Sequence, residues 1–90
     1  MLFPKITKQF EKDKEKSRKQ KRNFLVLNHV VNQLIEEKIL DPKYCDHPLN
    51  GEWKGFRDCH IQNDWVLIYK IDKTEKTITF VRLGSHSELF

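Results

Sequence analysis

The chain has 90 residues, of which 33% are charged and 38% hydrophobic, and its net charge is +4. This length predicts a single domain over residues 1–90, and six Phe, two Trp and two Tyr exclude a disordered chain. No apolar stretch approaches the roughly 18 residues of a membrane helix, and no basic leader precedes a long apolar segment, so we expect no membrane association.

A short strand and two helices are expected first along the chain. Residues 2–6 predict a short edge strand, because the proline among them cannot donate a ladder hydrogen bond. Thr7 is a candidate cap for a helix over residues 8–22, which lack Gly and Pro and are rich in good helix formers. A second helix is expected over Asn23–Lys38, and its apolar face contains Phe24, Leu27, Val31 and Leu34.

Positive charge is concentrated in the first of these helices. Residues 5–22 hold nine Lys or Arg against three acids, whereas residues 23–90 hold eight basic and ten acidic residues. The local balances of +6 and −2 indicate a basic segment on a nearly neutral body, which is typical of a protein with an anionic partner such as nucleic acid. A solvated helix face is the alternative interpretation. If the partner is RNA, we expect contacts from Lys12, Lys16 and Lys19.

A loop over residues 41–52 precedes three segments with the character of strands. These segments are Trp53–His60, Asp64–Ile71 and Lys76–Gly84, and turn-forming residues separate them. The middle segment begins with an almost continuous apolar run, which indicates a central strand. The order strand, helix, helix, strand, strand, strand predicts an α+β fold, in which an antiparallel sheet carries the N-terminal helix pair on one face.

The two faces of such a sheet have different surroundings, because the helix pair covers only one of them. Aromatic side chains near Lys and Arg on the open face would form stacking platforms for unpaired bases. The sequence favours a core position for Trp53, and it leaves Trp65 undecided between the core and the open face.

The last third of the chain contains most of the side chains that can transfer protons. His47, His60 and His86 lie here together with Asp64 and Arg82. A pair of histidines can supply a base and an acid near neutral pH, and an arginine matches the geometry of a phosphate. This set suits metal-free cleavage of RNA, in which the 2′-hydroxyl attacks the adjacent phosphorus and the 5′-oxygen leaves. Scattered structural histidines are the alternative.

Other chemistries fit the sequence less well. Cys59 and His60 are neighbours on a predicted strand, so their side chains would point to opposite faces and could not form a nucleophile pair. Five side chains are of metal-ligand types, but their spacing matches no zinc pattern: Cys45, His47, Cys59, His60 and His86. We therefore expect no cofactor and no metal, and two reduced cysteines in a cytoplasmic protein.

Three runs of this sequence resemble the YafQ branch of the RelE superfamily. They are His47-Pro-Leu-x-Gly-x-Trp-Lys-Gly-x-Arg-Asp-x-His60, Asp64-Trp65-x-Leu-Ile-Tyr-Lys70 and Arg82-x-Gly-Ser-His86-Ser-Glu-Leu-Phe90. These proteins are toxins of bacterial type II toxin–antitoxin systems. The resemblance implies a compact RelE-like βααβββ toxin that enters the ribosomal A site, near 16S rRNA, and cuts translated mRNA. It also implies a neutralising antitoxin as a protein partner.

The resemblance implies roles for individual residues as well. Its catalytic positions fall on His47, His60, Asp64 and His86, and supporting positions fall on Trp65, Arg82 and Phe90. Our hypothesis makes Asp64 and His86 the acid–base groups, with His47 and His60 contacting RNA or shuttling protons and Arg82 on the scissile phosphate. Phe90 or Trp65 would hold an mRNA base. Basic side chains near the site would contact the RNA backbone, among them Lys54 and Arg57.

Three classes of function follow from these features. The first is a ribosome-dependent mRNA endonuclease that inhibits translation. The second is a toxin of the same fold that acts on another target such as DNA gyrase, although that branch usually lacks this set of histidines. The third is a non-catalytic protein that binds RNA or only an antitoxin.

Overall fold

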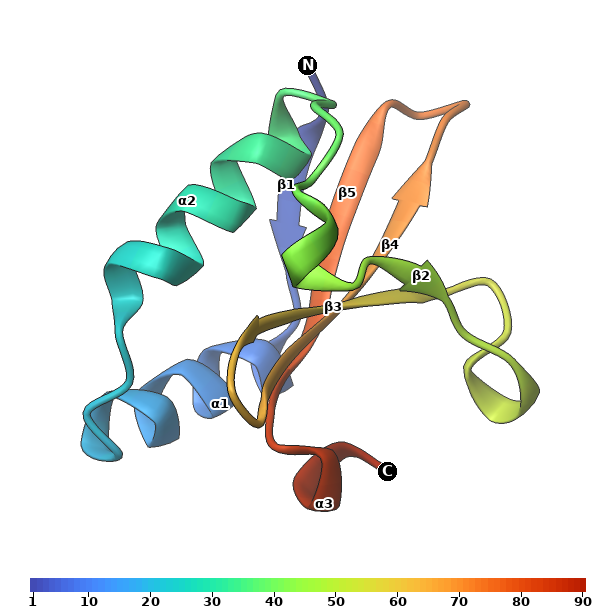
Figure 1. Cartoon of the computed structure of the whole chain (residues 1–90). Coiled ribbons are helices and arrows are strands. Elements are labelled where there is room, and N and C mark those ends of the chain that lie inside the picture. The colour runs from blue at the N-terminus through green and yellow to red at the C-terminus, as the bar shows by residue number, and fades with distance from the viewer.

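The computed structural model describes residues 1–90 as a five-stranded sheet with two helices on one face and a short third helix on the other (Figure 1). The strands are ordered β1-β5-β4-β3-β2 across the sheet, so β4 is central, as its apolar run predicted. Both long helices have twelve residues, and neither is long or apolar enough to span a membrane. The elements in chain order are β1 (Phe3–Ile6), α1 (Lys8–Lys19), α2 (Phe24–Ile35), β2 (His47–Pro48), β3 (Arg57–Gln62), β4 (Trp65–Asp72), β5 (Thr77–Gly84) and α3 (His86–Leu89), with 3-10 turns at Pro42–Tyr44 and Gly51–Trp53.

The two predicted helix caps are both confirmed. Thr7 accepts a hydrogen bond from the backbone N–H of Phe10, and Asn23 accepts one from that of Leu25. The first helix ends at Lys19 and the second at Ile35, each three residues before the predicted end. After each helix the chain passes through a residue with positive φ, which ends the helix. This residue is Lys21 after the first helix and Glu37 after the second.

The sheet is mixed rather than wholly antiparallel. Strands β2 to β5 form the expected antiparallel arrangement, but β1 pairs in parallel with β5 from Phe3↔Thr77 to Ile6↔Phe80. The chain reverses direction twice through α1 and α2 before β3, so the direction of β1 depends on tertiary packing. Beyond the end of β1, Thr7 Oγ1 donates to the carbonyl of Val81 and Asp13 accepts from the N–H of Leu83, so side chains satisfy the remaining edge of β5.

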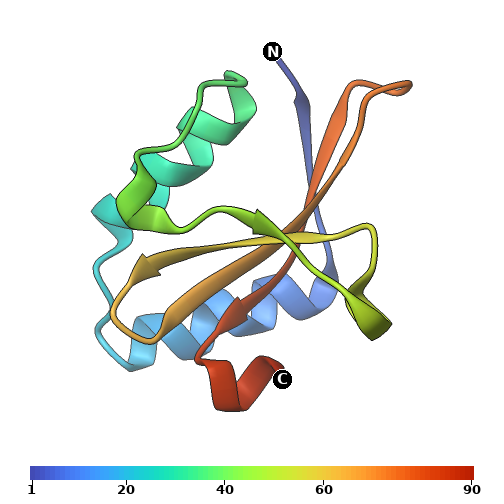
Figure 2. The ribbon, with the colours of Figure 1, turned by 45° about the vertical axis from the view of Figure 1, so that its right-hand side comes forward.

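The face that α1 and α2 cover, here called the helix face, contains the main core. Fifteen buried residues form one cluster, which includes Phe10 of α1, three residues of α2 and alternate residues of the central strand. On β4 the buried side chains of this face are Trp65, Leu67 and Tyr69. Figures 1 and 2 show both long helices on the same side of the strands. Burial of this apolar cluster is the main source of stability for so small a protein.

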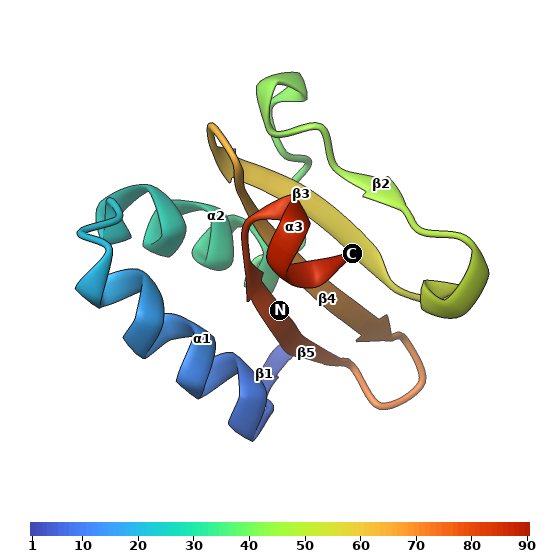
Figure 3. The same cartoon turned by 90° about the horizontal axis from the view of Figure 1, so that it is seen from below.

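The opposite face, here called the open face, is much less covered. Only Val66, Ile68 and Leu89 are buried in its separate cluster, with partly buried side chains around them. Leu89 belongs to α3, which overlies β3, β4 and β5 in the view from below (Figure 3). The open face therefore leaves space for polar side chains on β2, β3 and the N-terminal end of α3.

Candidate active site

Three histidines from separate parts of the chain meet on the open face. The ring centroids of His47 and His60 are 6.4 Å apart, and those of His60 and His86 are 5.0 Å apart. His47 lies on β2, His60 on β3 and His86 at the first position of α3. The expected gathering of these side chains is therefore present. The fourth histidine, His29, is exposed on α2 outside this group.

Asp64 fixes the orientation of His86. One carboxylate oxygen, Oδ1, accepts hydrogen bonds from the backbone N–H of His86 at 2.9 Å and from its Nδ1 at 2.7 Å. These bonds, first the backbone one and then the side-chain one, lower the pKa of Asp64. Asp64 is thus an ionised acceptor at neutral pH, and the Nε2 atom of His86 points away from it. The turn that presents Asp64 contains Asn63 at φ 39°, a left-handed conformation that asparagine tolerates.

Both ring nitrogens of His47 lie close to protein oxygens. Nδ1 is 2.7 Å from the carbonyl oxygen of Cys45, which can only accept, so Nδ1 carries a proton. Nε2 is 3.1 Å from Oδ1 of Asp58, an atom otherwise without a hydrogen-bond partner and shielded from water. The contact is close but not aligned as a straight hydrogen bond. A proton on Nε2 of His47 or on the carboxyl group of Asp58 would make this contact attractive.

Asp58 is a candidate functional residue that the sequence analysis did not single out. It pairs with His47 across β2 and β3, and its side chain is 4% exposed beneath the imidazoles. Burial raises the pKa of Asp58, and the three histidines His47, His60 and His86 oppose this shift. A buried acid with a raised pKa among titratable rings is typical of a functional site. The signal was available, since Asp58 and His60 are two apart on one strand and must share a face.

His60 lies between the other two rings and differs from them in its hydrogen bonding. The protein hydrogen bonds and close ionic contacts of this cluster are made by His47 and His86, and none is made by His60. Its ring meets that of His86 edge to face. His60 and His86 therefore present ring nitrogens that a substrate can reach, whereas those of His47 are occupied.

The short helix α3 is fastened to α1. Ser85 and Glu88 form a capping box, in which each side chain accepts from the backbone N–H of the other residue. Lys16 of α1 forms an ion pair with Glu88. The hydrogen bond from Lys16, followed by that from the backbone of Ser85, lowers the pKa of Glu88 to about 2. This predicted RNA-binding lysine therefore also holds the helix that carries His86.

Arg82 lies apart from the histidine cluster. Its Nε donates to Asp13 of α1 at 2.8 Å, and Asp13 is buried. Asp58, Ile68 and Arg82 occupy one row across three strands, so Arg82 is two strand spacings, about 10 Å, from Asp58 along the sheet. The expected contact with the scissile phosphate is thus replaced here by an ion pair that attaches α1 to β5. A hollow of about 320 Å³ beside this pair is lined by Arg82, Lys12, Lys16 and four further residues.

The structure places Trp65 in the core, where the sequence had left its position undecided, and it places Trp53 outside the main core, where the sequence had favoured a core position. Trp65 is fully buried on the helix face, where it packs on Phe24 and its Nε1 donates to Ser17 at 3.1 Å, so the expected role in stacking on RNA is wrong. Trp53 is half-buried on the open face, with its ring centroid 6.3 Å from that of Phe90. Phe90 is 55% exposed and its centroid lies 6.1 Å from that of His86. Trp53 and Phe90 are therefore the aromatic side chains beside the histidines.

The predicted basic contacts also divide between the two faces. Arg57 pairs with Tyr69 across the sheet and with Asp46 through its guanidinium, which places it on the helix face and contradicts its expected contact with RNA at the histidines. Lys54 is exposed in the loop that carries Trp53, and Lys12 and Lys19 are exposed on α1. Lys70, which the sequence did not single out, lies on the open face with Nζ 5.2 Å from the centroid of Phe56.

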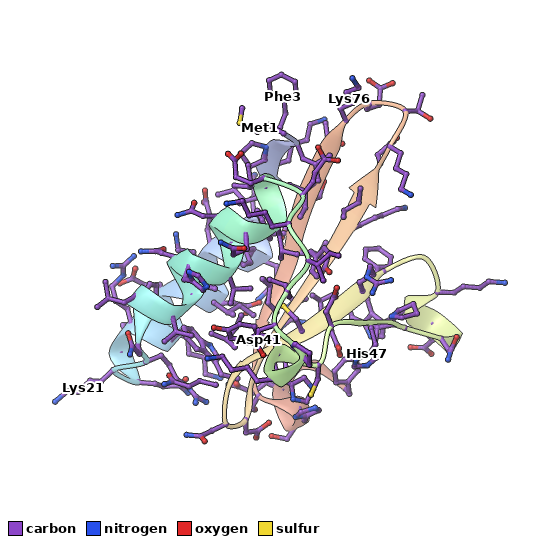
Figure 4. All side chains as sticks on the ribbon, turned by 45° about the horizontal axis from the view of Figure 1, so that its top comes forward. Met1, Phe3, Lys21, Asp41, His47 and Lys76 are labelled. Carbon is purple, nitrogen blue, oxygen red and sulfur yellow. The ribbon has the colours of Figure 1, made fainter.

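A hollow of about 950 Å³ lies away from the histidines. It lies on the helix face, and Figure 4 shows three of its lining residues, Met1, Asp41 and Lys76, on different segments from His47. Among the His, Cys, Asp and Glu side chains of the whole chain, no group of three or more is arranged to hold a metal ion. The arrangement on the open face is one of ionisable side chains around a polar surface, which suits proton transfer.

Comparison with known proteins agrees with this geometry. Residues 2–90 match the family described as a bacterial toxin of type II toxin–antitoxin systems, YafQ. The mRNA interferase toxin YafQ of Escherichia coli is 41% identical over 83 residues, which cover 91% of this chain and 88% of that protein.

Solved structures show the same fold over the whole chain. A metal-bound toxin from Helicobacter pylori is 48% identical, with a TM-score of 0.94 and full coverage of both chains. YafQ in the Escherichia coli DinJ–YafQ complex is 36% identical, with a TM-score of 0.91 and coverage of 100% of this chain and 99% of that chain. The expected α+β fold is confirmed, and this chain belongs to the YafQ family of toxins from bacterial type II toxin–antitoxin systems.

Proposed function

We propose that this chain is an mRNA endonuclease, which enters the A site of the ribosome and cuts the mRNA that is being translated. The observation that carries the proposal is the cluster of His47, His60 and His86 on the open face, with centroids 5.0 and 6.4 Å apart. The name mRNA interferase, which a relative with 41% identity bears, supports the same activity. The proposed reaction uses a 2′-hydroxyl as the nucleophile, which RNA has and DNA lacks, so it requires an RNA substrate.

His60 and His86 perform the two proton transfers. His60 removes the proton of the 2′-hydroxyl while that oxygen attacks the adjacent phosphorus. His86 gives a proton to the 5′-oxygen as its bond to phosphorus breaks, which leaves a 2′,3′-cyclic phosphate and a 5′-hydroxyl. His86 is assigned as the acid because Asp64 holds its backbone N–H and its Nδ1, which leaves Nε2 oriented toward the substrate side of the cluster. Asp64 orients His86 and does not itself transfer a proton.

The remaining polar groups stabilise negative charge. His47 and Asp58 hold a shared proton beside the other two rings, so His47 supplies a positive edge to the phosphorane. Lys12, Lys16 and Arg82 line one hollow beside α3, where they would contact flanking phosphates. Phe90 and Trp53 would stack on a base next to the cut. Lys19, one turn further along α1, would contact 16S rRNA.

The partners of this chain are an antitoxin, the ribosome and mRNA. The structure of the Escherichia coli relative with DinJ supports an antitoxin that binds and neutralises this chain. Action on translating ribosomes requires a cytoplasmic location. Because a phosphate ester can be cut by two imidazoles alone, the reaction needs no metal cofactor. Treatment with a chelator of transition metals that leaves ribosomal Mg²⁺ in place should not change the rate of cleavage.

Cleavage in a reconstituted translation system tests the proposal. Purified wild-type protein is added to a defined mRNA, with and without ribosomes, and primer extension maps the 5′ ends. We expect cuts within the reading frame only when ribosomes translate it. Cleavage of free mRNA at the same rate would contradict ribosome dependence. An intact mRNA together with inhibited DNA supercoiling would instead indicate a toxin that acts on DNA gyrase, and no effect on either would indicate a binding protein.

A further inference from the structure

Asp46 precedes His47 in the chain, but its side chain lies on the other face of the sheet. One carboxylate oxygen accepts from the hydroxyl of Tyr69, which belongs to the core of the helix face. The guanidinium of Arg57 donates to both oxygens, from Nε at 3.4 Å and from Nη2 at 3.3 Å. Adjacent residues of an extended segment point to opposite faces, so this arrangement fixes the backbone on which His47 is mounted.

The backbone alone holds His47 weakly. Strand β2 has only two residues, and its ladder with β3 consists of His47↔Asp58 and Pro48↔Arg57. The segment before it passes through Cys45 at φ 49°, a left-handed conformation that is unfavourable for residues other than Gly. An additional contact is therefore needed to hold the carbonyl of Cys45 and the ring of His47 in place.

The contact of Asp46 with Tyr69 and Arg57 meets this need over a wide pH range. Tyr69 is 1% exposed, and burial, followed by the hydrogen bond to Asp46, raises the pKa of its phenol far above the usual value. The phenol therefore remains a donor whenever the protein is folded. Asp46 is only 26% exposed in its side chain, so water competes weakly for its oxygens.

We propose that Tyr69, Asp46 and Arg57 form a positioning device, here called the Asp46 anchor, which sets the place and orientation of His47 from the far side of the sheet. The anchor fixes the carbonyl of Cys45, which accepts from Nδ1 of His47 at 2.7 Å and so determines which ring nitrogen faces Asp58. None of the three residues touches the RNA. Their effect on cleavage rests on the proposed function of the histidine cluster.

The groups around His47 define what loss of the anchor would change. Asp58 lies 3.1 Å from Nε2, and the ring of His60 is the other titratable neighbour. If the ring of His47 shifts, its Nε2 moves away from Asp58 and its Nδ1 moves away from the carbonyl of Cys45. His86 is held separately by Asp64 and should not respond in the same way.

Tyr69→Phe tests the anchor with little change in packing, and Asp46→Asn tests it without altering the core. Tyr44→Phe is the matched control, because it removes a phenol hydroxyl from the same core cluster at a position where that hydroxyl has no protein partner. The first measurement is the set of imidazole nitrogen chemical shifts by NMR on the free, full-length protein. The second measurement is steady-state cleavage on ribosomes, with kcat and KM determined separately.

We expect both anchor variants to move the ring-nitrogen signals of His47, while the signals of His86 stay in place. We expect kcat to fall about tenfold with little change in KM, because a misplaced group weakens the chemical step more than binding. His47 signals that coincide with those of Tyr44→Phe would overturn the proposal. His47 signals that move while kcat stays unchanged would support the anchor and contradict the role of His47 in cleavage.

Discussion

The two faces of the sheet divide stability and chemistry between them. On the central strand, Trp65, Leu67 and Tyr69 enter a core of fifteen buried residues, whereas Val66 and Ile68 belong to a cluster of only three buried residues with partly buried side chains around it. The helix face is sealed by α1 and α2, and the open face carries the three histidines and a buried carboxylate without a full set of partners. The central strand thus has a packed core on one side and, on the other, a surface whose polar groups lack some of their hydrogen-bond partners. This difference is expected where function opposes stability.

The largest effect is expected from His86→Ala on the open face. Loss of one proton-transfer group should slow single-turnover cleavage on ribosomes by about 10²- to 10⁴-fold and leave Tm nearly unchanged. His29→Ala is the matched control, since it removes an exposed histidine from α2 and should leave the rate unchanged. Equal rates for the wild type and His86→Ala would contradict the division between the faces.

On the helix face, Leu67→Ala should reduce the free energy of unfolding by about 2–5 kcal/mol, because it leaves a cavity among fully buried side chains. Leu49→Ala removes a leucine that is only half-buried on the open face. This change should reduce the free energy of unfolding by about 1 kcal/mol. Urea denaturation measures both values. A greater loss for Leu49→Ala would show that the open face contributes more to stability than its small cluster suggests.

Asp58→Asn should affect stability and activity in opposite directions. Burial raises the pKa of Asp58, so the folded chain binds this proton more tightly than the unfolded chain, and the resulting stability is lost as pH rises through the raised value. The asparagine variant avoids that loss, so its Tm should exceed that of the wild type at pH 8 and approach it near pH 4. Cleavage should fall about tenfold, because His47 loses the proton that it shares with Asp58. A lower Tm for the variant at every pH would contradict this account.

The smallest effect is expected from single lysines. Lys12→Ala should weaken binding to ribosomes a few-fold, and it should reduce the slope of log K against log salt by about one counterion. Lys73, in the turn between β4 and β5, gives the matched control, and Lys73→Ala should leave both quantities unchanged. Filter binding at several salt concentrations measures them, and an identical slope for Lys12→Ala and the wild type would remove Lys12 from the RNA contacts.

Local signals in the sequence predicted the framework of the fold well. The caps Thr7 and Asn23 act on backbone groups within three residues, so their effect does not depend on the rest of the structure. The apolar run of β4 predicted its central position, since a strand with partners on both sides has both faces buried. The gathering of the histidines was predicted from the family resemblance and not from spacing.

The features that were missed depend on pairing between distant segments. Trp65 shares its face with Leu67 and Tyr69 by alternation along β4, but only the packing of the distant helices α1 and α2 decides which of the two alternating sets is buried beneath them. The ion pair between Arg82 and Asp13 joins residues 69 positions apart. Arg82 therefore attaches α1 to β5, where the sequence had led us to expect a contact with the scissile phosphate. The signal for this ion pair was the spacing of Phe10, Asp13 and Ser17, which places two polar residues on the buried side of a basic helix.

Cleavage of an mRNA with sulfur in place of the 5′-oxygen at the scissile link tests the account most directly. Sulfur leaves without receiving a proton, so this substrate needs a base but no acid. We predict that His86→Ala cuts it within about tenfold of the wild-type rate on ribosomes, whereas His60→Ala remains slow on both substrates. Rescue of His60→Ala instead, or no rescue of either variant, would contradict the assignment of proton transfer to these two imidazoles.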